Sequence, residues 1–75
     1  MTDSQFAAIL VYTTSYAIRA EKLLTHAGIT TKLIPVPRHL SSDCGVCVRI
    51  HLAESTHAQK ILMDNKCEIE GVFPI

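Results

Sequence analysis

The chain has 75 residues, 48% of them hydrophobic, and its seven basic and seven acidic residues give no formal net charge. This length supports one small domain, residues 1–75, without room for the deep pocket of a self-contained metabolic enzyme. Balanced charge gives no bulk attraction to nucleic acid or to a membrane surface, so neither is expected as a partner. No apolar run approaches the roughly 20 residues that span a bilayer, and the polar residues 1–5 do not resemble a secretory leader, so we expect a cytoplasmic protein.

The first half of the chain predicts a strand, a helix and a second strand. Residues 6–12 form a continuous apolar run that is typical of a covered strand. Residues 13–15, Thr-Thr-Ser, offer N-cap side chains, and apolar residues then recur at helical spacing up to Gly28, which suits a helix end. Residues 29–36 are β-branched and partly alternating, and the prolines at their end predict an edge strand.

The second half repeats a strand, a helix and a strand after a polar turn at residues 38–43. Residues 46–52 alternate between apolar and polar side chains, as a half-buried strand does. A helix is expected to open at residues 53–56 and to end at Asn65, and residues 69–75 predict a last strand. The order βαββαβ favours an α+β, ferredoxin-like sandwich with two helices on one face of a four-stranded antiparallel sheet. Another α+β arrangement of the same elements is the alternative.

This topology brings three junctions to one edge of the sheet: residues 13–15, the turn 38–44, and residues 65–67. A helix N-terminus and basic side chains at one edge would favour a thiolate and attract small anions. The residues expected to bind an anion or to stabilise a thiolate there are Thr14, Ser15, Arg38, Ser41, Ser42, Gly45 and Lys66.

The three cysteines are an odd number and predict free thiols in a reducing compartment. Cys44 is the best candidate for chemistry, because it ends a polar turn where a partner can reach it; a buried, space-filling cysteine is the alternative. Cys67 is a candidate resolving thiol, or else a cysteine at the edge of the core.

Cys47 makes a Cys-x-x-Cys pattern with Cys44, which is a weak signal on a strand. The two Cα atoms would lie roughly 10 Å apart on opposite faces, too far for a disulfide. A structural zinc site is therefore not expected, nor any other metal or cofactor. A soft-metal chaperone that uses both thiols would need a bent loop and ranks last.

The open face of the sheet is expected to carry Cys47, Arg49 and His51 and to be mixed in polarity. A homodimer through this face is an expectation that the sequence does not demand. A second class of function is a non-catalytic interaction or small-anion sensor module, in which the turn 38–44 binds the ligand and the thiol is incidental.

Four segments carry a family resemblance: residues 19–24 (Arg-Ala-Glu-Lys-Leu-Leu), residues 28–29, residues 33–38, and residues 40–45 (Leu-Ser-Ser-Asp-Cys-Gly). Together they resemble the putative selenium/sulfur carrier-like family of small single-domain proteins. The resemblance implies that Cys44 carries sulfur or selenium as a persulfide or selenopersulfide, between a donor protein and an acceptor protein. Such a protein is an accessory to enzymes, with little turnover of its own. Cys47 and Cys67 lie outside the motif, and the chain lacks the Cys-Pro-x-Pro motif of other sulfur-transfer proteins.

Overall fold

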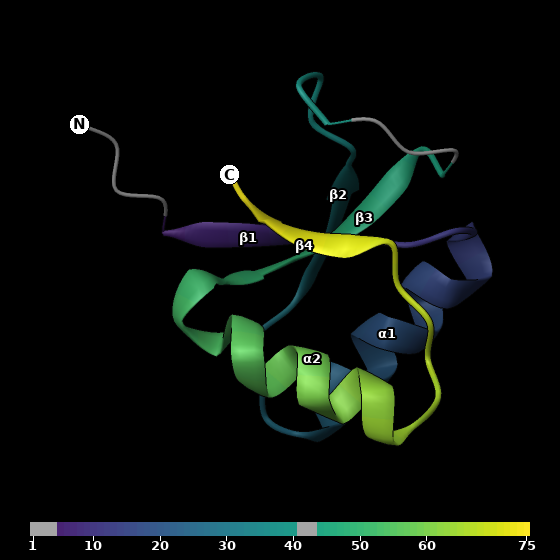
Figure 1. Ribbon diagram of the computed structural model, residues 1–75, viewed down its shortest axis with the longest axis vertical. Coiled ribbons are helices and arrows are strands. Elements are labelled where there is room, and N and C mark those ends of the chain that lie inside the picture. The colour runs from purple at the N-terminus through teal and green to yellow at the C-terminus, as the bar shows by residue number, and fades with distance from the viewer. Residues whose placement is uncertain (1–4, 41–43) are drawn as a thin grey trace.

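The computed structural model describes residues 5–40 and 44–75 (Figure 1). The predicted site residues Ser41 and Ser42 lie outside this part. The elements are β1 (Phe6–Leu10), α1 (Thr14–His26), β2 (Lys32–Pro35), β3 (Val46–His51), the 3-10 helix η1 (Leu52–Glu54), α2 (Ser55–Asp64) and β4 (Gly71–Pro74). Within the described ranges, neither helix is long and apolar enough to cross a membrane.

The four strands form one antiparallel sheet in the order β2-β3-β1-β4. Both helices pack on the same side of this sheet, which leaves the other side as an outer face (Figure 1). The predicted α+β class, with a four-stranded antiparallel sheet and two helices, is confirmed. The prediction that the proline-containing strand lies at an edge is also confirmed, since β2 has a neighbour on one side only.

The main core lies between the helices and the sheet. Alternate residues of β1, such as Ala7 and Ile9, are fully buried against the helices, as the period-2 geometry of a strand requires. The helices contribute their predicted apolar stripes, with Leu24 from α1 and Leu62 from α2 fully buried. This packing determines which end of each helix and strand lies at the end of the sheet that holds Cys44.

The outer face carries a second, smaller apolar cluster. Its buried members are Ala8, Leu10 and Cys47, and Ile34, Val36, Leu40 and Ile75 pack against them. The chain after β2 therefore folds back over the sheet, and the N–H of Leu40 donates to the carbonyl of Pro37 at 3.0 Å within that turn. Cys47 lies on the outer face of the sheet, as predicted. At this point, however, the turn after β2 covers the face, which was expected to be open.

The ends of the helices differ in part from the prediction. Gly28 follows the C-cap of α1 with φ of 89°, as predicted for a glycine that ends a helix. At α2, Asn65 is the C-cap itself and Lys66 takes the left-handed conformation with φ of 56°. The amide of Asn65 donates back to the carbonyl of Ile61 at 2.8 Å, which satisfies one of the open helix carbonyls.

Several predicted bounds are too wide. The strand expected at 29–36 is β2, Lys32–Pro35, because the N–H of Ile29 still donates to the Leu24 carbonyl at 2.9 Å and closes the end of α1. The helix expected from residue 53 begins at Ser55 after the turn of η1. The first and last strands are also shorter than expected, at Phe6–Leu10 and Gly71–Pro74.

Candidate functional site

The Cys44 side chain points into the core on the helix side of the sheet, and the residue is only 4% exposed. It has the same parity as Val46, Val48 and Ile50, so the alternation of β3 continues back to it and turns it inward. The expectation that a partner reaches this thiol directly at the end of the turn is therefore wrong for the structure as it stands.

The sulfur of Cys44 lies 3.8 Å from the Oγ1 atom of Thr14, the first residue of α1, and either group can donate the hydrogen bond. Thr13 caps the helix, since its Oγ1 accepts from the N–H of Tyr16 at 3.3 Å. The start of a helix carries partial positive charge, which favours a nearby anion. The start of α1 thus contacts Cys44 through Thr14, and both Thr14 and Ser15 are exposed.

Cys47 lies on the other side of the sheet from Cys44, in the outer cluster, and is fully buried. Its sulfur is 4.0 Å from the carbonyl oxygen of Pro35. Burial raises the pKa of Cys47, and the proximity of Cys44 raises it further. The two thiols of the Cys-x-x-Cys pattern thus face opposite ways. Across residues 5–40 and 44–75, His, Cys, Asp and Glu side chains form no group of three or more suited to a metal ion.

Cys67 follows α2 and is 3% exposed, with its N–H donating to the Leu62 carbonyl at 2.8 Å. Burial raises the pKa of Cys67, and the positive charge of Arg19 offsets part of that rise. The Arg19 guanidinium reaches across from α1 and donates to the carbonyl of Asn65 at 2.9 Å. A resolving role toward Cys44 stays a prediction.

The contact of Arg19 with the end of α2 is a feature near Cys67 that the sequence did not predict. Arg19 lies off the apolar stripe of α1, where a solvated arginine is the ordinary expectation. The available signal was topological, because α1 starts and α2 ends at the same edge of the sheet. An arginine in the second turn of α1 can therefore reach the last carbonyls of α2.

The other predicted site residues that the structure describes are exposed. Arg38 is exposed in the turn that covers the outer face, between Pro37 and Leu40. Lys66 is exposed and shares a hollow of about 400 Å³ with Cys67 and Tyr12. Gly45 is exposed, its carbonyl accepts from the N–H of Val36 at 3.2 Å, and a Cβ built on it would meet no atom within 4 Å.

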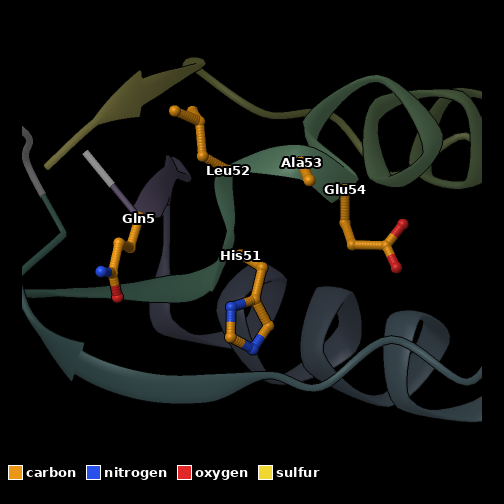
Figure 2. Close-up of a pocket in the computed structure, with 5 residues that line it drawn as sticks. All are labelled: Gln5, His51, Leu52, Ala53 and Glu54. Atoms are coloured by element: carbon orange, nitrogen blue, oxygen red, sulfur yellow. The ribbon is translucent and has the colours of Figure 1, made fainter. Parts of the chain in front are cut away.

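A wider hollow of about 670 Å³ lies where β3 runs into η1, at the end of that strand remote from Cys44. Gln5, His51 and Glu54 are among its lining residues, and Figure 2 shows the carboxylate of Glu54 pointing away from the His51 ring. Oε1 of Glu54 instead lies 3.7 Å from Nδ1 of His57. The polar side chains that line this hollow point in different directions and do not converge on one ligand. The hollow is therefore a weaker candidate for a functional site than the end of the sheet that holds Cys44.

The comparison with protein families finds a match over most of this chain. The family model described as "Putative Se/S carrier protein-like" matches residues 7–74, which takes in both helices and nearly the whole sheet. Neither the curated proteins nor the solved structures contain a match to this chain.

Proposed function

The chain belongs to the putative Se/S carrier protein-like family, and from that premise we propose that Cys44 carries a terminal sulfur or selenium atom between partner proteins. The observation that carries the proposal is the position of the Cys44 sulfur, 3.8 Å from Thr14 Oγ1 at the start of α1. A hydroxyl donor and the positive end of a helix both stabilise a thiolate or persulfide anion.

The choice among the three thiols follows from their surroundings. Burial raises the pKa of Cys47 and of Cys67, so both are held as neutral thiols near pH 7 and are weak nucleophiles. Cys47 also lies under the turn that covers the outer face. Cys44 is the thiol beside a helix start, and it is the cysteine within the family's characteristic turn.

The transfer needs no external oxidant. The Cys44 thiolate attacks the terminal sulfur of a donor persulfide, so a new S–S bond forms at Cys44 while the donor's S–S bond breaks. The electron pair of the broken bond stays on the donor sulfur, which leaves as a thiolate. An acceptor nucleophile then attacks the terminal sulfur on Cys44 and returns Cys44 to its thiolate. Selenium takes the place of the terminal sulfur without changing this balance.

The burial of Cys44 suits a carrier, because a persulfide shielded from solvent is protected from small thiols that would reduce it. The same burial requires that a partner, or a movement at this edge, uncovers the sulfur for each transfer. The sheet order β2-β3-β1-β4 and the two helices on one face support a ferredoxin-like scaffold for this site. We propose that the protein works in the cytoplasm with a sulfur or selenium donor and an acceptor.

The experiment is to incubate the protein with a cysteine desulfurase and free cysteine, and to measure intact mass without reductant. One added sulfur is expected, and peptide mapping should place it on Cys44. Cys44→Ser and Cys44→Ala should both lose the added mass, while Cys47→Ala and Cys67→Ala should keep it. Circular dichroism on each variant establishes that the domain is folded.

Two outcomes would contradict the carrier. Loading that persists in Cys44→Ala would place the chemistry on another thiol. Absence of loading in a folded protein whose Cys44 also resists alkylation would favour the non-catalytic interaction module, in which the thiol only fills the core. Loading that requires Cys67 as well would instead add the resolving step to the mechanism.

A further inference from the structure

One row of side chains crosses the outer face of the sheet from β2 to β4. In the strand register, Lys32 lies opposite Arg49, Arg49 opposite Ala8, and Ala8 opposite Phe73. With strands about 4.8 Å apart, the row is roughly 14 Å long. It therefore offers two cations, a small buried residue and an aromatic ring in a line.

The two cations at one end of this row oppose each other directly. Like charges at facing positions of neighbouring strands destabilise a sheet, so folding alone does not favour Lys32 opposite Arg49. The described acidic residues do not compensate, because they lie on the helices, in η1 or in the connection before β4. They are Glu21, Glu54, Asp64, Glu68 and Glu70. This electropositive spot stands out in a chain without net charge.

The Arg49 guanidinium is held in place by an aromatic ring. Its central carbon lies 4.3 Å from the ring centroid of Phe6, on the side away from Lys32. The His51 ring also stacks on Phe6, with centroids 5.2 Å apart. A guanidinium fixed on a ring loses little freedom on binding and presents its planar fork to a carboxylate.

The other end of the row is apolar. Ala8 is fully buried, whereas Phe73 is 39% exposed. Gly71 lets the Phe73 ring lie along the strand, since a Cβ at that glycine would come within 2.9 Å of a ring carbon. Ala8 is itself inaccessible, so the ring of Phe73 is the apolar surface that this end of the row offers to a partner.

We propose that this row docks an extended segment of a partner protein in which carboxylates stand beside an apolar side chain. The carboxylates pair with Lys32 and Arg49, and the apolar side chain lies against Phe73. The docking is independent of sulfur transfer at Cys44. A second copy of the chain is a poor occupant, since face-to-face packing would bring two cationic rows together. Single-stranded nucleic acid is also disfavoured, because Arg49 and His51 occupy the ring of Phe6 that a base would stack on.

The probe is a short synthetic peptide that repeats Glu-Glu-Leu, titrated into isotopically labelled protein while amide NMR shifts are followed. The matched peptide repeats Gln-Gln-Leu, and an oligouridine serves as the nucleic-acid arm. The acidic peptide should shift the amides of Lys32, Arg49, Ala8 and Phe73. Its affinity should fall as ionic strength rises from about 0.01 M to about 0.15 M, because the Debye length shrinks from roughly 30 Å to roughly 8 Å.

Two double variants distinguish binding at this row from a general effect of positive charge on the protein. Lys32→Gln with Arg49→Gln should weaken acidic-peptide binding by about tenfold or more, which is the effect of about 1.4 kcal/mol. Lys22→Gln with Lys60→Gln removes the same charge from the helices and should leave binding unchanged. Lys32→Gln alone keeps Arg49 on Phe6 and should weaken binding by a smaller factor.

The proposal is overturned by equal binding of the glutamine peptide, shifts confined to the helices, no effect of the row variants, or tighter binding of oligouridine. The last result would assign the face to nucleic acid. Self-association that buries these same amides without any peptide would assign it to a homodimer.

Discussion

Thr14 and Cys44 are thirty residues apart in the chain, yet Oγ1 of one lies 3.8 Å from the sulfur of the other. The contact ties the start of α1 to the segment that leads into β3. It exists because antiparallel packing returns both junctions to one edge of the sheet. A hydroxyl at the first residue of a helix is a hydrogen-bond donor within the region where the helix dipole acts most strongly.

Thr14→Val tests this contact, because valine keeps the shape of threonine and removes the hydroxyl. The alkylation rate of Cys44 by iodoacetamide, resolved by peptide mapping, should fall about threefold or more, as expected for the loss of one hydrogen bond. Thr14→Ser keeps a hydroxyl and should keep the rate. Ser15→Ala removes an exposed neighbouring hydroxyl and serves as the matched control. Equal rates in Thr14→Val and Thr14→Ser would show that the hydroxyl does not act on the sulfur.

The backbone pattern of this small domain was largely readable from its residues. The alternation of residues 46–52 correctly placed Cys47 on the face opposite the helices, and the prolines correctly predicted that β2 is an edge. Gly28 marked the end of α1 because few other residues accept its positive φ. Each of these features depends on local sequence alone.

The surroundings of the thiols were less predictable. The burial of Cys44 depends on how the chain before β3 continues the strand's alternation, which polar turn residues obscure. The covering of Cys47 depends on the path of the turn that carries Leu40 across the sheet. The pairing of Arg19 with the end of α2 joins residues distant in sequence. Such tertiary contacts leave no periodic signal in one sequence.

Gly45→Ala separates a structural role of this glycine from a chemical one. A Cβ would meet no atom within 4 Å and the backbone φ lies outside the left-handed region, so stability should hold, or rise by about 0.4–1 kcal/mol through a less flexible unfolded chain. Gly28→Ala is the contrast, because φ of 89° is strained for alanine, and it should cost about 1–2 kcal/mol. Urea denaturation gives both values.

The same Gly45→Ala variant also tests whether this glycine affects sulfur loading on Cys44. If Gly45→Ala folds as well as the native chain but loads sulfur more slowly, the glycine serves access to Cys44 rather than the fold. A large loss of stability in Gly45→Ala would contradict the open space around this residue.

Lys32→Glu should stabilise the fold while abolishing acidic-peptide binding. The change replaces a like-charge pair with Arg49 by an opposite-charge pair at facing positions, worth about 0.2–1 kcal/mol. Chemical denaturation at low salt should show the gain, and added salt should reduce it. Lys22→Glu on α1 is the control for a general change in net charge. A loss of stability in Lys32→Glu would mean that Lys32 makes a favourable contact in the native sheet.

Alkaline pH should destabilise the domain by ionising the buried thiols of Cys47 and Cys67. Burial raises the pKa of Cys47 and Cys67 above the ordinary value of 9.0. The stability that the domain gains from keeping these two thiols protonated is therefore fully present below pH 9. Above that pH the unfolded chain loses these protons before the folded chain does, and the free energy of unfolding must fall. The slope is at most about 1.4 kcal/mol per pH unit for each thiol.

Cys47→Ala tests how much of this pH dependence of the free energy of unfolding comes from Cys47. The variant should be less stable than the native chain at pH 7, because it loses a fully buried side-chain atom, yet its stability should fall less steeply above pH 9. The remaining side chains are the same in both proteins, so the comparison reports on Cys47. Denaturation curves at a series of pH values, under reductant to keep the thiols free, give the two slopes. Parallel slopes would show that the Cys47 thiol ionises as easily in the folded chain as in the unfolded one, in conflict with its burial beneath the turn that holds Leu40.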